Sequence, residues 1–279
     1  MSLFDQTFDP ARDAALVTGA GNGIGRAIAQ ALVGEGVRTI FADINPQTIK
    51  AAVESSPRPE LAVPWVGDLA DPKACEALFA HAISAVGQVT HFVHSASPPR
   101  READHAFAVS QQTWERMRAV NVEAGFYLAR ELARKLIATK QPGSFLFLTS
   151  LHTETPRNLP HYSTAKAAIA MLVKELAKTL GRFGIRVNAL VPGAVAAGGF
   201  VADPALARHI PLGRLGQAED LAPMALAILS NRLSAYVTGA AIVVDGGLSL
   251  TNWFEPPDLG ERGILDLGLG AQDQPAAKV

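Results

Sequence analysis

Cysteine is almost absent from this sequence, in which Cys75 is the only one among 279 residues. A single thiol cannot form an intramolecular disulfide, which fits a reducing compartment, so we expect a cytoplasmic protein. Cys75 lies in an amphipathic run, residues 73–86, that we interpret as a helix. At that position a small buried apolar residue is a better interpretation than a nucleophile.

Excess charge and long apolar runs are absent as well. The 25 lysines and arginines balance 26 aspartates and glutamates, and the sequence has no basic stripe of the kind that binds nucleic acid. No apolar run reaches the ~18 residues needed to span a bilayer, and residues 1–13 carry acids without an apolar core. We therefore expect no nucleic-acid partner, no membrane partner and no signal peptide.

What the sequence does contain is short apolar runs that alternate with longer amphipathic stretches. The runs are near-continuously apolar, which is typical of strands buried on both faces of a parallel sheet. The predicted strands are 14–18, 37–43, 61–66, 90–95, 144–150, 185–191 and 241–245, and the predicted helices are 24–35, 73–86, 113–137, 162–182 and 218–229. This alternation predicts an α/β fold: one doubly wound Rossmann domain over residues 1–250, with a mostly parallel seven-stranded sheet and helices on both faces.

Residues 251–279 differ in composition from the rest of the chain. They contain two adjacent prolines and a glycine-rich run, which favour fraying. Trp253 and Phe254 favour burial instead, because large aromatic side chains are seldom left in water. We expect a C-terminal tail that is partly flexible or in contact with another subunit.

A glycine-rich turn joins the first predicted strand to the first predicted helix, with the sequence Thr18-Gly19-Ala20-Gly21-Asn22-Gly23-Ile24-Gly25. Such a turn presents backbone N–H groups and the positive end of a helix to a pyrophosphate. The pattern T-G-x-x-x-G-x-G is complete, whereas G-x-G-x-x-G fails because position 24 is Ile. Asp43 closes the next predicted strand, where a carboxylate accepts hydrogen bonds from an adenosine ribose. Together the two features predict a dinucleotide site.

Tyr162 and Lys166 stand four residues apart at the start of a predicted helix, so their side chains share one face. An ammonium group beside a phenol stabilises the phenolate. Ser150 ends the preceding predicted strand, which places its hydroxyl at the carboxyl edge of the sheet, where open α/β folds bind ligands. Asn121 falls in the middle of a predicted long helix, where its residue type by itself indicates a solvated or helix-bending side chain.

These motifs, in this order, resemble those of the short-chain dehydrogenase/reductase family over roughly residues 12–250. The matching positions are Thr18–Gly25, Asp43, Asp68 in Gly67-Asp68-Leu69, Asn121, Ser150, Tyr162–Lys166, Pro192-Gly193 and Asp245-Gly246-Gly247. The resemblance implies an oxidoreductase that transfers a hydride between NAD(H) and a secondary alcohol or its ketone. It also implies a homotetramer, or failing that a dimer, formed through the predicted helices 113–137 and 162–182.

The resemblance implies roles for individual residues. Tyr162 would be the general acid/base, Ser150 would hydrogen-bond the same substrate oxygen, and Lys166 would favour the ionised phenol and hold the nicotinamide ribose. Asn121 would anchor a water that continues the proton relay. The implied cofactor-binding residues are Gly19, Gly21, Asn22, Gly23, Ile24, Gly25, Asp43, Ile44, Asp68, Leu69, Ser95, Ala96, Tyr162, Lys166, Pro192, Gly193 and Val195.

Three positions depart from the family's pattern. His94-Ser95-Ala96-Ser97 stands where Asn-Asn-Ala-Gly is usual, which leaves the cofactor contacts of that loop open. The segment before Tyr162 is one residue shorter than the commonest spacing, so Thr149 is an alternative catalytic hydroxyl. We prefer Ser150, because residues 148–154 resemble a serine-containing stretch of some sugar dehydrogenases. Ala197 replaces a common threonine, which removes a hydroxyl near the carboxamide.

The seven histidines raise the question of a metal site. The sequence has neither H-E-x-x-H nor C-x-x-C spacing, and hydride transfer to a nicotinamide needs no metal, so we expect none. His152 and His161 flank the catalytic segment and are candidate neighbours of the substrate. Residues 198–209 correspond to the family's substrate-binding loop, with Gly198-Gly199 as a hinge.

The substrate class stays open at this point. The likeness around Ser150 favours a small polar alcohol, a polyol or a sugar as the small-molecule partner. A 3-oxoacyl thioester reductase is the alternative among enzymes, and a nicotinamide-binding sensor or scaffold without turnover is the alternative of another class. A sensor would not require Ser150, Tyr162, Lys166 and Asn121 together, which favours the enzyme.

Overall fold

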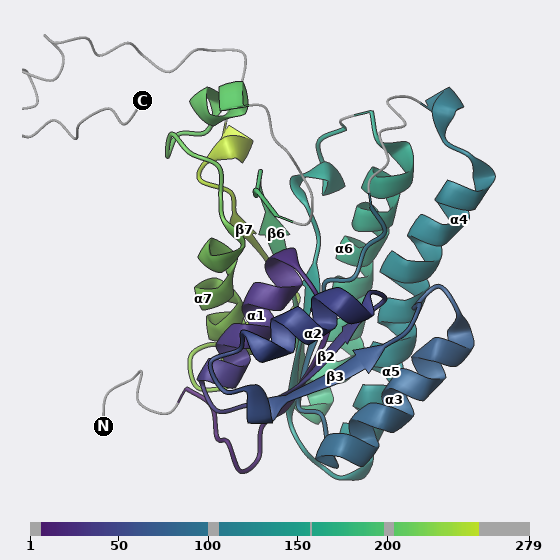
Figure 1. Ribbon diagram of the computed structural model, residues 1–279, viewed down its shortest axis with the longest axis vertical. Helices are drawn as coiled ribbons and strands as arrows, with labels where there is room; N and C mark the ends of the chain where they lie inside the picture. Colours follow the sequence, from purple (N-terminus) through teal and green to yellow (C-terminus); the bar gives the residue numbers. More distant parts are fainter. Residues whose placement is uncertain (1–6, 100–105, 157, 198–203, 251–279) are drawn as a thin grey trace, which may run out of the picture. The chain divides into compact units, whose positions relative to one another are not determined.

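Seven strands form one parallel sheet in the part of the chain that the computed structural model describes, residues 7–99, 106–156, 158–197 and 204–250. The strand order is β3-β2-β1-β4-β5-β6-β7, and every neighbouring pair is parallel (Figure 1). The predicted doubly wound α/β fold is confirmed. The sheet is wholly parallel rather than mostly parallel.

The strands form where the sequence has its near-continuous apolar runs. Every residue of β1, β5 and β6 is buried, because helices cover both faces of the sheet, whereas the edge strands β3 and β7 are only partly buried. The strands are β1 (Ala14–Thr18), β2 (Arg38–Asp43), β3 (Ala62–Val66), β4 (His91–His94), β5 (Gly143–Leu148), β6 (Ile185–Pro192) and β7 (Ala241–Val244).

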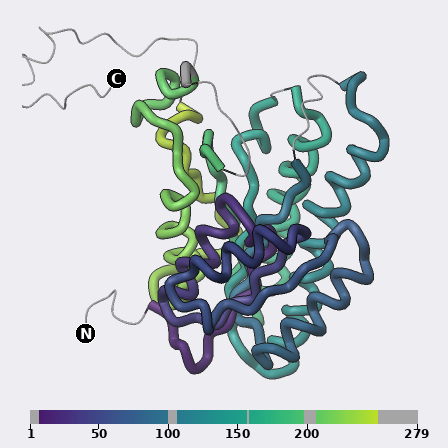
Figure 2. The backbone as a smooth tube through the Cα atoms, viewed as in Figure 1, coloured from purple at the N-terminus to yellow at the C-terminus, as the bar shows by residue number. Residues whose placement is uncertain are grey.

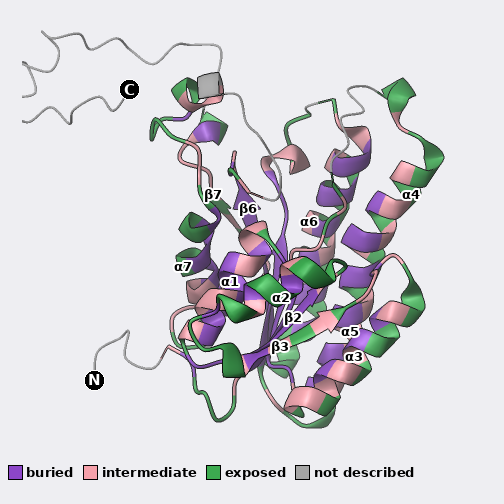
Figure 3. Cartoon of the chain, viewed as in Figure 1, coloured by how far each residue is buried: buried purple, intermediate pink, exposed green. Residues whose placement is uncertain are grey.

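Two layers of helices enclose the sheet, and alternate strand residues point to each. Val17 of β1 packs in the core that contains α1 and α7, while its neighbour Leu16 packs in the core that contains α3, α5 and α6. Figure 3 shows the buried strands between the two layers of helices. The helices are α1 (Gly23–Gly34), α2 (Pro46–Glu54), α3 (Pro72–Val86), α4 (Gln111–Arg118), α5 (Ala124–Ala138), α6 (Pro160–Leu180) and α7 (Ala218–Leu229). Figure 2 traces the chain through them in order.

The long helix predicted over residues 113–137 is interrupted. Helices α4 and α5 are joined by a π-helical turn over Ala119–Glu123, and Asn121 lies within it. The amide Nδ2 of Asn121 donates to the carbonyl of Met117 at 3.0 Å, and the imidazole of His94 lies against the carbonyls of Val120 and Asn121. Side chains therefore insert into the backbone ladder at this turn, which is a recognised cause of a π-bulge. Apolar periodicity does not reveal such an insertion.

The strand order reverses direction at β1 and β4. The connections from β1 lead towards β2 and β3, whereas those from β4 lead towards β5, β6 and β7. The carboxyl ends of β1 and β4 are therefore left uncovered side by side, and this switch point is where open α/β sheets bind ligands. Thr18 and His94, the last residues of the two strands, are register partners there.

Three expectations fall on residues outside the described ranges. They concern the hinge at Gly198-Gly199, the first half of the proposed substrate-binding loop, and the tail with Trp253 and Phe254. In the described ranges, no helix has the length and apolar character needed to cross a membrane.

At the opposite, amino edge of the sheet, the buried His91 and the partly buried Asp13 link β4 to the segment before β1. Nε2 of His91, at the start of β4, lies 3.2 Å from Oδ1 of Asp13, and the N–H of Asp9 donates to Oδ2 of Asp13 at 2.8 Å. Burial by itself would raise the pKa of Asp13, but the hydrogen bond and the charge of His91, with the Asp9 N–H, leave the pKa below its usual value. A lowered carboxyl pKa stabilises the fold at any pH above the unfolded-state pKa.

We predict that Asp13→Asn lowers the free energy of unfolding by about 1 kcal/mol at pH 7, equivalent to about 2–4 °C in Tm. The folded-state pKa is the lower one, so the difference from wild type should persist down to about pH 4 and shrink below it, as Asp13 takes up its proton. Tm measured from pH 7 to pH 3 tests this, with the exposed Glu60→Gln as the charge-matched control. A difference that grows as the pH falls would contradict the assignment.

Candidate active site

The glycine-rich turn lies at the carboxyl end of β1 and leads directly into α1. Gly19 has a positive φ of 69°, and a Cβ there would lie 2.8 Å from the backbone of Ala96. A Cβ on Gly25 would meet the carbonyl of Gly19. The turn is therefore packed too closely for side chains at these two positions, and it leaves backbone N–H groups beside the start of the helix.

Asp43 joins this turn to the end of β2. Its Oδ2 accepts a hydrogen bond from the N–H of Gly21 at 3.0 Å, and its Oδ1 accepts one from the N–H of Asn45 at 3.1 Å. A Cβ on Gly21 would lie 2.9 Å from the carboxyl carbon of Asp43. A carboxylate has about four acceptor positions, so both oxygens can accept further bonds. The helix that follows is capped by Asn45 and not by Asp43, so helix capping does not account for the carboxylate of Asp43.

Asp43 borders a pocket of about 290 Å³ beside the turn. The pocket is lined by Gly19, Asp43, Ile44, Gly67, Asp68, Leu69, Ala96, Ser97, Pro98, Pro99, Arg116 and Val120. Arg116 of α4 forms a two-point ion pair with Asp68, at 2.9 and 3.2 Å. Burial opposes ionisation of Asp68, but Arg116 and the N–H of Ala70 hold its pKa below the usual value. The structure thus brings the expected adenosine-side residues together around one cavity and adds a guanidinium to them.

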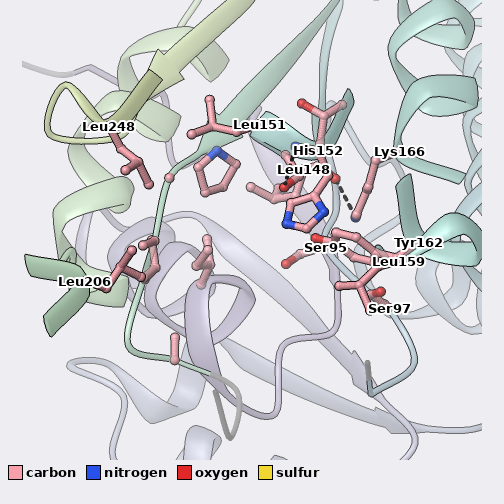
Figure 4. Close-up of a pocket in the computed structure, with 18 residues that line it drawn as sticks. Ser95, Ser97, Leu148, Leu151, His152, Leu159, Tyr162, Lys166, Leu206 and Leu248 are labelled. Carbon is pink, nitrogen blue, oxygen red and sulfur yellow. Dashed lines mark hydrogen bonds between the residues drawn. The ribbon is translucent and has the colours of Figure 1, made fainter. Parts of the chain in front are cut away.

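A second pocket of about 380 Å³ lies over the ends of β5 and β6 (Figure 4). It is lined by Ile24, Ser95, Ser97, Leu148, Thr149, Ser150, Leu151, His152, Leu159, Tyr162, Lys166, Pro192, Gly193, Ala194, Val195, Ala197, Leu206 and Leu248. The predicted proton-transfer residues Ser150, Tyr162 and Lys166 therefore face the same cavity as Pro192 and Val195.

Tyr162 and Lys166 lie on the first turns of α6 and are 8% and 4% exposed. Nζ of Lys166 donates to the carbonyl of Leu148 at 2.8 Å and lies 5.4 Å from the centre of the Tyr162 ring. The ring of His152 meets Tyr162 edge to face, with 5.2 Å between centroids. A buried phenol beside a buried ammonium is an arrangement that can exchange a proton with a bound hydroxyl.

The two candidate hydroxyls, Thr149 and Ser150, follow β5 and both line the larger pocket. The Thr149 hydroxyl donates to the carbonyl of Leu190 at 3.1 Å, so its proton is committed to the backbone. The Ser150 hydroxyl accepts from the N–H of His152 at 3.3 Å and caps a short 3₁₀ turn. A hydroxyl that accepts from the backbone retains its own proton for a ligand, which favours Ser150.

Asn121 is fully buried behind the pocket and does not line it. Its Nδ2 donates to Oγ of Ser97 at 3.2 Å as well as to Met117. Its Oδ1 is buried and has no hydrogen-bond partner among the described residues. Buried amide oxygens are rarely left unpaired, so this atom can accept a hydrogen bond from a bound group.

The expected site residues differ in how directly they meet a cavity. Gly21, Asn22, Gly23 and Gly25 build the turn without lining either pocket, and Ser95 and Ala96 line one pocket each. Of the two flanking histidines, His152 lines the larger pocket and His161 is buried away from it. Ala197, which replaces the common threonine, lines the same pocket.

Several site residues carry no local signal in the sequence. Arg116 reaches Asp68 across 48 positions of the chain, and Ser97 both lines the two pockets and accepts from Asn121, 24 positions away. The apolar wall of the larger pocket is formed by Leu151, Leu159, Leu206 and Leu248, which come from four separate segments. Only the fold brings such residues together.

Metal chemistry and thiol chemistry find no support in the described residues. No group of three or more histidine, cysteine, aspartate or glutamate side chains lies close enough there to hold a metal ion. Cys75 is 3% exposed within the apolar core, and burial raises the pKa of its thiol to about 11. At neutral pH this thiol is protonated and a poor nucleophile.

Comparison with known proteins identifies the family. Residues 19–249 match the family model described as enoyl-(acyl carrier protein) reductase. The chain belongs to the short-chain dehydrogenase/reductase family. Its resemblance to that family is thereby confirmed, and the chain is an oxidoreductase that acts on CH–OH groups with a nicotinamide dinucleotide, NAD or NADP.

Individual family members act on chemically different alcohols. The (3R)-3-hydroxyacyl-CoA dehydrogenase of Mus musculus is 30% identical over 84% of this chain and 95% of its own length. The L-rhamnose 1-dehydrogenase (NAD(P)(+)) of Sphingomonas sp. is 31% identical over 84% of this chain and 94% of its own length. The crystal structure of 3-ketoacyl-(acyl-carrier-protein) reductase from Brucella melitensis, complexed with NADH, superposes with a TM-score of 0.80 and 27% sequence identity. The match covers 85% of the present chain and 98% of the Brucella chain.

Proposed function

We propose that this chain is an NAD-preferring dehydrogenase that interconverts a secondary alcohol and its ketone. The alcohol is a small polar alcohol, a polyol or a sugar. The observation that carries the proposal is the larger pocket, in which Ser150, Tyr162 and Lys166 face Pro192 and Val195.

The residues present fit a nicotinamide dinucleotide. The turn at Gly19, Gly21 and Gly25 is a cradle that side chains would fill, and it lies at the start of a helix. The smaller pocket, with Asp43, Asp68 and Leu69, would hold the adenosine. The larger pocket, with Ser95, Pro192, Gly193 and Val195, would hold the nicotinamide. When bound, the nicotinamide supplies the hydride chemistry.

Tyr162 and Ser150 act on the substrate oxygen. In the oxidation direction the ionised phenol of Tyr162 takes the hydroxyl proton, and in the reduction direction the neutral phenol returns one. The hydroxyl of Ser150 donates a hydrogen bond to the same oxygen and holds it within reach of Tyr162. General acid/base catalysis of this kind contributes ~10²–10⁴ in rate, and positioning supplies much of the rest.

Lys166 and Asn121 support the proton transfer from behind Tyr162. The ammonium of Lys166, 5.4 Å from the phenol ring, stabilises the ionised phenol and would bind the nicotinamide ribose. The unpaired Oδ1 of Asn121 would hold a water that passes the proton on.

Asp43 supports a preference for NAD over NADP. Its oxygens accept two backbone hydrogen bonds and retain positions for ribose hydroxyls, each worth ~1.5–3 kcal/mol as a charge-assisted bond. A 2′-phosphate near the carboxylate would be repelled by about 4 kcal/mol at ~4 Å and an effective dielectric of 20. Arg116 borders the same pocket and could offset this repulsion, but both its terminal nitrogens already bind Asp68.

A 3-oxoacyl thioester reductase is the second candidate, and one observation favours it. Leu151, Leu159, Leu206 and Leu248 give the larger pocket an apolar wall, which suits an acyl chain better than a sugar. His152 is the polar side chain on the same wall and suits a hydroxylated substrate. Neighbouring residues of one pocket therefore favour different substrate classes: the leucines favour an acyl chain, and His152 favours a hydroxylated substrate.

A substrate screen separates these candidates. NAD⁺ reduction is measured by NADH absorbance across secondary alcohols, polyols, sugars and 3-hydroxyacyl thioesters, and NADH binding is measured in parallel. Turnover of a polyol or sugar supports the first candidate, and turnover of the thioesters alone supports the second. Tight NADH binding without turnover of any compound would indicate a sensor or scaffold.

A homotetramer in the cytoplasm, or failing that a dimer, completes the proposal. Phe126 on α5 and Met171 on α6 are 41% and 56% exposed in the single chain, although both are large apolar residues. These two helices are the ones expected to form subunit contacts, and association would cover the exposed side chains. The single reduced cysteine fits the cytoplasm.

We predict that Tyr162→Phe reduces turnover by about 10²–10⁴-fold and leaves NADH affinity within about threefold of wild type, because the ring still packs and only the transferable proton is lost. Lys166→Ala should weaken both turnover and NADH binding. Alcohol oxidation by the wild type should rise with pH, because the phenolate is the base. The fully exposed Tyr236→Phe is the control. Steady-state kinetics with fluorescence binding measure all of these, and an active Tyr162→Phe variant would overturn the assignment.

We predict that kcat/KM with NAD exceeds that with NADP by roughly 30-fold or more, because half of the repulsion at Asp43 is already about 2 kcal/mol. Asp43→Ala should lower this ratio at least about tenfold. Glu54→Gln removes one exposed charge elsewhere on the chain and should leave the ratio unchanged. Equal use of both cofactors by the wild type would show that Asp43 does not discriminate between the ribose of NAD and the 2′-phosphate of NADP.

We predict that light scattering at micromolar concentration gives four times the mass of one chain, or twice in a dimer. Met171→Asp should lower the measured mass, since it places a charge on the face that association covers, whereas Met171→Leu should keep it. A single-chain mass for the wild type would refute the subunit contact.

A further inference from the structure

His94 ends β4 and is 1% exposed, between the glycine turn and the π-helical turn. Its Nδ1 lies 2.9 Å from the hydroxyl of Thr18, the residue before Gly19. Its Nε2 lies 3.1 Å from both the carbonyl of Val120 and the carbonyl of Asn121. One imidazole therefore contacts the strand that carries the phosphate-binding turn and the turn that carries Asn121.

The surrounding groups select one form of the ring. The two carbonyls can only accept, so Nε2 must carry a proton. The Thr18 hydroxyl already accepts from the N–H groups of Ser95 and Ala96, at 3.2 and 3.3 Å. For its own proton, Nδ1 at 2.9 Å is a closer acceptor than the carbonyl of Val93 at 3.5 Å, so the hydroxyl donates to Nδ1. Burial, and secondarily the positive charge of Lys166, lower the pKa of His94 to about 4. At neutral pH His94 is a neutral Nε2–H imidazole with both nitrogens hydrogen-bonded.

Gly125 makes room for this ring. It lies in α5, where glycine is a poor helix former, and its φ is not positive. A Cβ at position 125 would lie 2.8 Å from Cδ2 and 2.9 Å from Nε2 of His94. The nearby Phe147 ring is 3.2 Å from the same point and blocks an outward shift. The approach of the imidazole thus accounts for a glycine that the helix itself does not require.

We propose that His94 is a positioning residue that fixes the π-helical turn, and with it Asn121, to the end of β1, and that Gly125 is its paired residue. The inference rests on the proposed function for its catalytic consequence. By holding the Val120 and Asn121 carbonyls, His94 sets where the unpaired Oδ1 of Asn121 stands relative to Lys166. The asparagine that is usual at position 94 is too short to span both sides, because its amide reaches only as far as Nδ1 of the histidine.

Two substitutions test the contacts of the two ring nitrogens separately. The amide of His94→Asn can replace Nδ1 and keep the contact with Thr18, whereas the amide of His94→Gln can replace Nε2 and keep the contact with the carbonyls. We expect His94→Asn to lower kcat about tenfold or more with NADH affinity within about twofold. We expect His94→Gln to keep kcat within about threefold. His91→Asn, in the same strand, should lower Tm without lowering kcat.

A double-mutant cycle tests the pairing without any assay of turnover. Gly125→Ala should lower Tm by about 5 °C or more in the wild type, because the Cβ meets the ring. In His94→Asn the same change should leave Tm unchanged or raise it, because alanine is the better helix former once the ring is absent. Equal effects in both backgrounds would overturn the pairing of His94 with Gly125.

Nitrogen-15 NMR of histidine-labelled wild-type protein at pH 7 tests the ring itself, with the His94 signals assigned by their loss in His94→Gln. An Nε2–H tautomer supports the proposal, and an imidazolium or an Nδ1–H tautomer overturns it. A fall in Tm for both His94 variants with kcat preserved would make the role purely structural and would also overturn it. Should no panel substrate be turned over by the wild type, the proposed function fails, while the cycle, the NADH affinity and the NMR result still decide whether His94 holds this turn.

Discussion

The parallel pairing of β1 with β4 is the constraint on which the rest of the molecule depends. The chain leaves these two strands in opposite directions, so no connection covers their carboxyl ends. Backbone N–H groups at that edge need partners, and the hydroxyl of Thr18 supplies one to Ser95 and Ala96. The glycine turn, the loop after β4 and the π-helical turn are all arranged around this one hydroxyl and its partner His94.

The two edges of the sheet divide the polar groups by task. At the carboxyl edge, hydroxyls, an ammonium and a carboxylate border the two site pockets. At the amino edge, Arg186 is buried at the start of β6, and its guanidinium donates to the carbonyls of Ile228, Leu229 and Val237. Those bonds hold the guanidinium against backbone carbonyls, and Arg186 lines neither of the two site pockets. The polar groups at one end of the sheet thus border the site pockets, and the hydrogen bonds of Arg186 at the other end stabilise the fold.

The sequence predicts most of the sheet and the centre of the site, for physical reasons that can be named. Buried parallel strands need continuous apolar runs, and a phosphate-binding turn needs glycines, so β1, β5, β6 and the turn at Gly19 are visible in the residue pattern. Tyr162 and Lys166 are four residues apart, so helix geometry alone predicts that their side chains share one face. Long-range contacts leave no such pattern. The ion pair of Arg116 with Asp68 and the insertion of His94 into the π-helical turn each depend on where distant segments meet.

The contact between His94 and Gly125 also limits the order in which the two positions can change. Histidine beside alanine would be crowded, whereas asparagine beside glycine merely gives up the helix preference of alanine, about 1 kcal/mol. An ancestor with the usual asparagine would therefore have to acquire glycine in α5 before it could accept histidine in β4. Reversal would run through the same intermediate, with the strand residue changing first. The two positions can therefore change only through the intermediate with asparagine and glycine. Relatives that carry histidine at the end of this strand should therefore carry glycine at the facing helix position.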